Sequence, residues 1–165
     1  MNPRPIALAD DGLIPNSLLP LLVYAAALGE VTDRAVAFEA LFASNGWSRS
    51  WRNGIYAFRH YHSTAHEVLG IAAGWAHVEF GGPQGVELNV QAGDAVLIPA
   101  GVSHYNLGAS DDLLVIGSYL DGSESADLRR DTEADRAASL ARIAALPIPP
   151  RDPVLGEGGL STLWS

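Results

Sequence analysis

GIYAFRHYHSTAHEVLGIAAG, residues 54–74, is the stretch from which the rest of the chain can be interpreted. Three of the five histidines and one glutamate fall in an eight-residue window, at His60, His62, His66 and Glu67. Side chains two positions apart on a β-strand share a face, so His60 and His62 are expected to point the same way. Two adjacent imidazoles with a carboxylate five residues later resemble half of a metal site.

The residues around this pair indicate where it lies. Phe58 and Tyr56 continue the same strand face backwards, which predicts that the histidines look into an aromatic-lined interior. Both aromatic residues are interpreted as core or pocket wall. His66 precedes Glu67 and would face away from it on a regular strand. It is either a surface or supporting histidine or a general base.

The spacing of residues 54–74 resembles the first cupin motif, Gly-x5-His-x-His-x4-Glu-x6-Gly, at every fixed position. The matching residues are Gly54, His60, His62, Glu67 and Gly74.

A second stretch, GDAVLIPAGVSHYN, resembles the second cupin motif, Gly-x5-Pro-x-Gly-x2-His-x3-Asn. The matching residues are Gly93, Pro99, Gly101 and His104. Gly108 departs from the motif, because asparagine is expected there, whereas an asparagine occurs earlier, at Asn106. Asn106 follows His104 by two residues and so shares its face. It either hydrogen-bonds a ligand or metal-bound water or caps the end of a strand.

The resemblance to cupins implies a metal site made by both motifs, with His60, His62, Glu67 and His104 as ligands. Three imidazoles and one carboxylate suit one divalent transition metal: Fe, Mn, Ni, Zn or Cu. An octahedral metal with four protein ligands keeps two adjacent positions open for a substrate or for substrate and dioxygen.

A closer resemblance covers most of the chain. Besides the two motifs, IPNSLLPLLVY and RDPVLGEGG are similar to the small YjlB-type bacterial cupins. This resemblance implies a mainly β fold, a double-stranded β-helix (jelly-roll) barrel with flanking N-terminal and C-terminal helices. It implies a metal site but no particular reaction.

The chain is expected to form a single cupin domain over residues 1–165. Residues 1–53 are interpreted as an extension with a helix, 54–120 as the barrel core, and 121–165 as a C-terminal helix and extended tail.

Local patterns predict the elements outside the motifs. Residues 18–28 fit a buried strand or a short helix, and we favour the strand. Thr32 or Asp33 is expected to cap a helix whose apolar face is Val36, Phe38, Leu41 and Phe42. A second helix is expected from a cap at Asp131 or Thr132 to about Ala145, with an apolar stripe of Leu140, Ile143 and Ala144.

Composition excludes several classes of function. The chain has no cysteine and no lysine, which rules out thiolate sites, Schiff-base lysines and phosphate-loop lysines. A formal charge of −9 disfavours nucleic acid and anionic membranes as partners. No signal peptide is visible, and the longest apolar run is too short for a membrane helix, so a cytoplasmic location is expected.

Two functions remain open. One is a metal-dependent enzyme that acts on a small oxygen-rich metabolite by dioxygenation, isomerisation or decarboxylation. The other is a non-catalytic binding or sensing module whose metal is structural or bridges a ligand. No catalytic residue is assigned; the pocket candidates are Tyr56, Phe58, His66, Asn106 and Tyr119. A small-molecule ligand is expected, and so is a homodimer to which LLPLLVY contributes.

Overall fold

The computed structural model describes residues 1–165 and contains eleven strands and two helices. In chain order these are β1 (Arg4–Leu8), β2 (Ser17–Tyr24), α1 (Arg34–Ser44), β3 (Arg49–Asn53), β4 (His60–Tyr61), β5 (Glu67–Ala73), β6 (Trp75–Phe80), β7 (Val86–Gln91), β8 (Ala95–Ile98), β9 (His104–Ala109), β10 (Leu114–Tyr119), β11 (Arg129–Arg130) and α2 (Glu133–Ala145).

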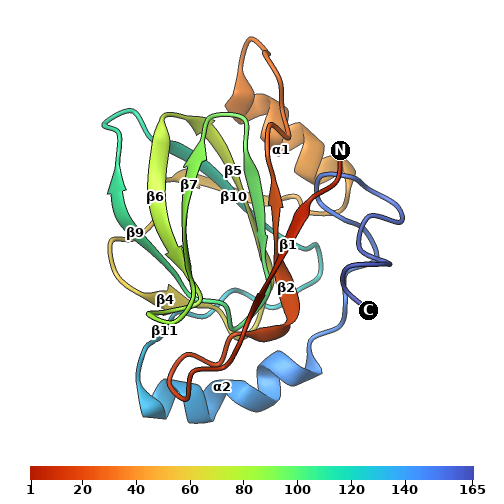
Figure 1. Cartoon of the computed structure of the whole chain (residues 1–165). Helices are drawn as coiled ribbons and strands as arrows, with labels where there is room; N and C mark the ends of the chain where they lie inside the picture. The colour runs from red at the N-terminus through yellow and green to blue at the C-terminus, as the bar shows by residue number, and fades with distance from the viewer.

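The strands form two antiparallel sheets that face each other as a barrel (Figure 1). Sheet A has the order β1-β2-β8-β5-β10-β3, and sheet B has the order β11-β4-β9-β6-β7. The crossing of the chain between the two sheets gives the jelly-roll topology that the cupin motifs predicted, and the flanking helices are present as well. The expected fold class is therefore confirmed.

Residues 1–53 contribute three of the six strands of sheet A, so the barrel is not confined to residues 54–120. β2 is a strand, as favoured from its sequence, and it lies between β1 and β8. Both of its edges are hydrogen-bonded within the chain. LLPLLVY therefore offers no free strand edge to a second copy, because the edge strands of sheet A are β1 and β3.

Two apolar clusters stabilise the barrel. One fills the space between the sheets and includes Leu69 and Ile71 of β5. The other lies on the outer side of sheet A and joins Val68 and Ala72 of the same strand to α1 and the C-terminal tail. Because side chains alternate along a strand, β5 serves both clusters and is buried on both faces. Gly70 is required there, since a Cβ would lie 2.6 Å from the Phe38 ring of α1.

The two helices begin at the predicted caps, and their buried faces agree with the prediction in part. Asp33 accepts a hydrogen bond from the Val36 amide, and Thr132 accepts one from the Asp135 amide. α1 buries Ala35, Phe38 and Phe42, whereas Val36 is half exposed.

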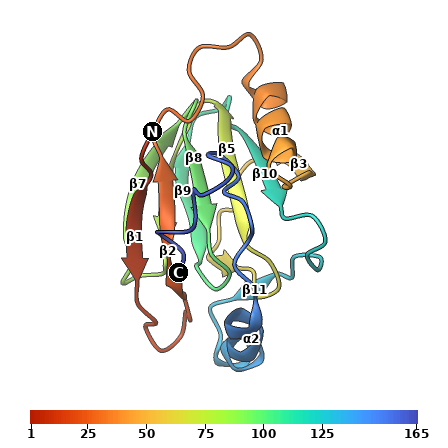
Figure 2. The ribbon, with the colours of Figure 1, turned by 90° about the vertical axis from the view of Figure 1, so that its right-hand side faces the viewer.

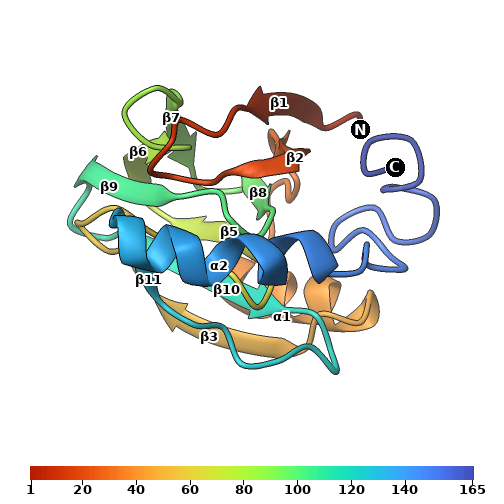
Figure 3. The same cartoon turned by 90° about the horizontal axis from the view of Figure 1, so that it is seen from below.

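α2 lies across the lower opening of the barrel (Figures 1 and 3). Its buried contact is made by Ser139, whose hydroxyl is 3.3 Å from that of Tyr61. Leu140 and Ala144 of the expected stripe face solvent. A polar, small-residue contact suits a helix that covers a barrel end and does not pack on an apolar sheet.

The C-terminal tail, residues 146–165, runs back along the outer face of sheet A (Figure 2). Leu160 and Trp164 are buried there, and the Trp164 indole donates to the Pro20 carbonyl at 2.9 Å. The Tyr24 hydroxyl donates to buried Asp152 at 2.7 Å. Neither helix is long and apolar enough to span a membrane.

Candidate metal centre

The three motif histidines meet at one end of the barrel. β4 and β9 pair with His60 directly opposite His104, and the two ring centroids lie 4.1 Å apart. His62 follows β4 and lies 5.5 Å from His104 by ring centroid. One ring nitrogen from each histidine lies within 4.8 Å of the others, so the three histidines form a group that could hold a metal ion.

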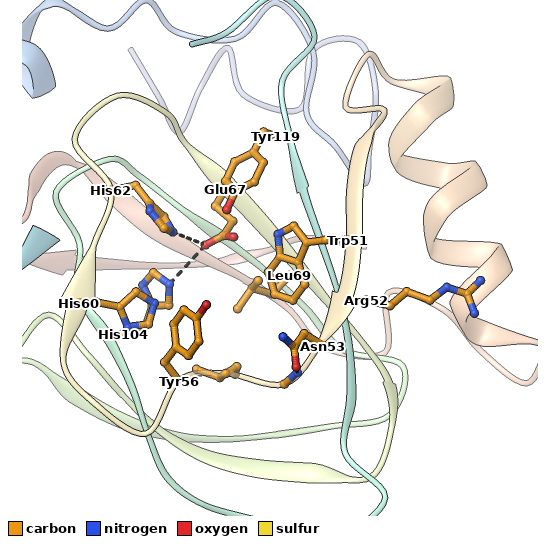
Figure 4. A pocket seen from close by; sticks show the side chains of 12 residues that line it. Trp51, Arg52, Asn53, Tyr56, His60, His62, Glu67, Leu69, His104 and Tyr119 are labelled. Carbon is orange, nitrogen blue, oxygen red and sulfur yellow. Dashed lines mark hydrogen bonds and ion pairs between the residues drawn. The ribbon is translucent and has the colours of Figure 1, made fainter. Parts of the chain in front are cut away.

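The fourth motif residue comes from the facing sheet. Glu67 begins β5, and its Oε2 atom lies 3.1 Å from Nε2 of His62 and 3.2 Å from Nε2 of His104 (Figure 4). The carboxylate is almost completely buried. His60 is not within hydrogen-bonding distance of it, so Glu67 joins the group through the other two rings.

In each ring the Nδ1 atom faces a backbone carbonyl, which leaves Nε2 for the centre of the group. The carbonyls are those of Phe58 for His60 at 3.0 Å, Asp127 for His62 at 2.5 Å and Val102 for His104 at 3.4 Å. Such outer contacts fix the tautomer and orientation of a metal-binding histidine. Three imidazole nitrogens and one carboxylate oxygen suit a divalent transition metal, so the residues present fit such an ion.

The side chains of this group change one another's pKa values. Burial, with the neighbouring His104 ring, lowers the pKa of His60 to about 3. Burial also opposes protonation of His62, but the charge and hydrogen bond of Glu67 outweigh it and raise the pKa of His62 to about 9. Burial works against the charge of Glu67 too, yet His62 and His104 lower the pKa of its carboxyl. Without metal, His62 and Glu67 therefore form a buried ion pair.

A cavity of about 330 Å³ opens onto the group. Besides the motif residues it is lined by Trp51, Arg52, Asn53, Gly54, Ile55, Tyr56, Leu69 and Tyr119. Arg52 extends away from the centre and forms two hydrogen bonds to Glu39, at 2.7 and 2.9 Å (Figure 4). The cavity wall therefore offers aromatic faces and hydroxyl groups but no free guanidinium.

Two of the pocket candidates from the sequence, Tyr56 and Tyr119, line this cavity. Phe58 is not among the lining residues; it stacks on Tyr56, with ring centroids 4.8 Å apart, and the Arg130 guanidinium lies over its ring at 4.2 Å. Only His60 and Tyr61 are in strand conformation, so the regular strand expected back to Tyr56 does not form. Tyr56 and Phe58 therefore lie in the loop that precedes β4, and of the two only Tyr56 lines the cavity.

His66 and Asn106 lie outside the cavity. The Nδ1 atom of His66 accepts the Ala100 amide at 2.9 Å, and its ring packs against Trp164. Burial lowers the pKa of His66 to about 4. The Asn106 amide group donates to the Ile55 carbonyl at 3.3 Å, and its oxygen accepts the Gly108 amide at 2.9 Å. The structure thus assigns both side chains to loop and strand-end contacts.

Trp51 and Asn53 of the cavity wall were not predicted from the sequence. They belong to β3, which reaches the site by pairing with β10. Gly117 of β10 lies opposite Trp51, and any side chain at Gly117 would collide with the indole ring. A glycine inside a predicted strand is a signal that another group approaches closely, although it does not say which one.

The buried histidines predict how the metal-free protein responds to acid. An unfolded histidine binds a proton near pH 6.5, whereas His60 and His66 do so only near pH 3 and 4. Below pH 6.5 the unfolded state therefore binds more protons than the folded state. The free energy of unfolding should fall by about 1.4 kcal/mol per pH unit for each of the two rings. The contribution of His62 to stability depends on pH in the opposite direction. It is complete below pH 6.5 and is lost as the pH rises to about 9.

We therefore expect the stability of the chelator-treated protein to be greatest near pH 6.5. Urea unfolding between pH 5 and 9 measures it, in a range above the titration of most carboxylates. A profile that is flat from pH 6.5 to 5 would show that the two rings are not buried as neutral groups.

Comparison with known proteins places the chain in a family. No protein-family model matches it. It is 38% identical over 149 residues to "Uncharacterized protein YjlB" of Bacillus subtilis (strain 168), and the match covers 90% of this chain and 87% of that protein.

Two solved structures are similar at lower identity. The first is acireductone dioxygenase from Bacillus anthracis with a cadmium ion in its active centre: 14% identity, TM-score 0.44, covering 65% of this chain and 82% of that one. The second is Bacillus subtilis oxalate decarboxylase, with Mn(II) centres: 18% identity, TM-score 0.37, covering 66% of this chain and 27% of that one. The identity to the first relative over nearly the whole chain, together with the jelly-roll topology, shows that this chain belongs to the YjlB family of cupins.

Proposed function

We propose that this chain binds one divalent transition metal through His60, His62, Glu67 and His104 and is an enzyme for a small oxygen-rich metabolite. The observation that carries the proposal is the convergence of three imidazoles and one carboxylate on the floor of an open cavity. A metal held only for stability would be enclosed by packed side chains, whereas this cavity gives a small molecule access to the ligand group.

A bound divalent metal would act as a Lewis acid that polarises an oxygen of the substrate. The protein would supply the remaining functions. Glu67 would balance part of the metal's charge, and Ile55 and Leu69 form apolar parts of the cavity wall. Tyr119 lines the cavity and is the candidate hydrogen-bond donor to a substrate oxygen, because burial and the negative charge of Glu67 raise the pKa of its hydroxyl and hold the proton on it.

The residues of the cavity wall also limit the charge and the shape of the substrate. A doubly charged phosphate or dicarboxylate would need basic side chains, but Arg52 is occupied by Glu39. Aromatic faces at Trp51 and Tyr56 favour a flat or ring-shaped molecule that carries neighbouring oxygens and at most one negative charge. Dioxygenation, isomerisation and decarboxylation of such a molecule are all compatible with this site.

The proposal is tested on untagged protein, by elemental analysis followed by a turnover screen of small hydroxy- and oxo-acids, diols and catechols. We expect one metal per chain and turnover of at least one compound. Tyr119→Phe should retain the metal and lose most of the activity, whereas Tyr105→Phe, whose ring faces Arg59 outside the cavity, should change neither. Metal without any turnover, together with tight binding of a compound from the screen, would favour the binding or sensing module instead.

We also propose that the protein is a homodimer in which two β1 strands meet at their free edges. β1 ends sheet A, and an unpaired strand edge tends to pair with another strand. Light scattering at micromolar concentration should give about twice the chain mass of 17.4 kDa. A mass of 17.4 kDa under these conditions would refute this assembly.

A further inference from the structure

The three histidines of the candidate metal centre are held in two different ways. His60 and His104 each face a carbonyl two residues earlier in their own segment, Phe58 and Val102. The orientation of these two rings is therefore set by the backbone immediately before each histidine. His62 instead faces the carbonyl of Asp127, which lies 65 residues further along the chain, and its 2.5 Å distance is the shortest of the three. The orientation of His62 therefore depends on a distant segment.

That segment is residues 120–128, which connects β10 to β11 and which we call the strap. Asp127 anchors it to the loop that follows His62. Its carboxylate accepts the Ser63 amide at 2.6 Å and the Ser63 hydroxyl at 2.5 Å. The Asp127 amide in turn donates to the Thr64 hydroxyl at 3.0 Å, and the Arg129 guanidinium donates to the carboxylate at 2.8 Å.

These contacts hold Asp127 through both its backbone amide and its carboxylate. The carboxylate is four-fifths buried, and its pKa is lowered to about 2: burial raises it, but hydrogen bonds from Ser63 and Arg129 outweigh that effect. The Asp127 carboxylate is therefore negatively charged at neutral pH and well below it. Loss of the carboxylate would leave the Ser63 amide and hydroxyl without this partner and would release the carbonyl that faces His62.

We infer that Asp127 is a positioning residue for the metal centre, which acts by holding the strap carbonyl against Nδ1 of His62. This contact requires the proton on Nδ1 and so directs the Nε2 lone pair towards the position of the metal. The inference rests on the proposed metal site, and it assigns the control of His62 to a segment outside both sequence motifs. Removal of an outer contact of this kind typically weakens metal binding about 10- to 100-fold.

The experiment compares Asp127→Ala and Ser63→Ala with Asp121→Ala as the matched control. Asp121 belongs to the same strap and accepts from the Ser48 amide and hydroxyl at 2.9 and 2.6 Å, and its carboxylate forms no hydrogen bond to His62, Ser63 or Thr64. Its loss should loosen the strap without releasing His62. Mn²⁺ and Zn²⁺ affinities are measured by calorimetry, and the His62 Nδ1–H proton is followed by NMR in the metal-free proteins.

We expect Asp127→Ala to bind metal about 10- to 100-fold more weakly and to lose the exchange-protected Nδ1–H signal, with a smaller change in the same direction for Ser63→Ala. Asp121→Ala should match the wild type in both measurements. If Asp127→Ala does not fold, Asp127→Asn, which keeps the shape, and Ser63→Ala decide the question. Unchanged affinity and an unchanged Nδ1–H signal in these variants would overturn the inference. Absence of metal binding by the wild type would refute the proposed function alone, since the proton signal tests the contact without metal.

Discussion

His104→Ala protein is expected to bind divalent metal at least about 100-fold more weakly than the wild type. Removal of an outer contact of a metal ligand already costs about 10- to 100-fold, and loss of the ligand itself must cost more. His104 also holds the Glu67 carboxylate at 3.2 Å and faces His60 across the β4–β9 pair, so its removal disturbs the other ligands. Calorimetric titration of the chelator-treated proteins measures the effect.

His77→Ala is the matched control for this variant. His77 lies on β6, is about one-third exposed, and forms hydrogen bonds of 2.7 Å to both Asn89 and Glu87, and it does not line the cavity. Its replacement should leave metal binding unchanged. Equal metal affinity in both variants would mean that the ion binds elsewhere, and the ligand set proposed from the two motifs would then be incorrect.

Trp164→Ala is expected to lower the free energy of unfolding by about 3–5 kcal/mol, the usual cost of removing a large aromatic side chain from a core. Trp164 is 1% exposed, packs against the His66 ring and donates to the Pro20 carbonyl. It closes the outer apolar cluster over sheet A from the end of the chain. Denaturant unfolding at neutral pH provides the measurement.

Trp75→Ala offers a control of the same residue type. Trp75 begins β6 and is 50% exposed, so its replacement should cost less than about 1 kcal/mol. If Trp164→Ala were as stable as Trp75→Ala, the C-terminal tail would not be part of the folded core, and the burial of Leu160 beside it would be in doubt as well.

The sequence predicted the parts of this protein that depend on fixed spacing or on local chemistry. The two motifs constrain His60 and His104 to opposing positions of neighbouring strands, and the barrel follows from that constraint. Helix caps are also local, because the side chain and the amide that it accepts lie within three residues; the predictions at Asp33 and Thr132 agree with the structure for this reason.

The remaining features depend on pairings between distant segments. β3 reaches the cavity only because it pairs with β10, and nothing in the residues around Trp51 specifies that partner. The contact from Asp127 to His62 likewise joins residues 65 positions apart. Periodicity also failed at residues 56–59, where a run that alternates like a strand lies in the loop that precedes β4.

The most direct test of the metal centre is a crystal structure of the metal-loaded, untagged protein with anomalous diffraction recorded at the absorption edge of the bound element. We expect one strong anomalous peak per chain, at about 2.0–2.3 Å from one nitrogen each of His60, His62 and His104 and from an oxygen of Glu67. A peak elsewhere, or a fully loaded crystal in which these four residues bind no ion, would contradict this expectation.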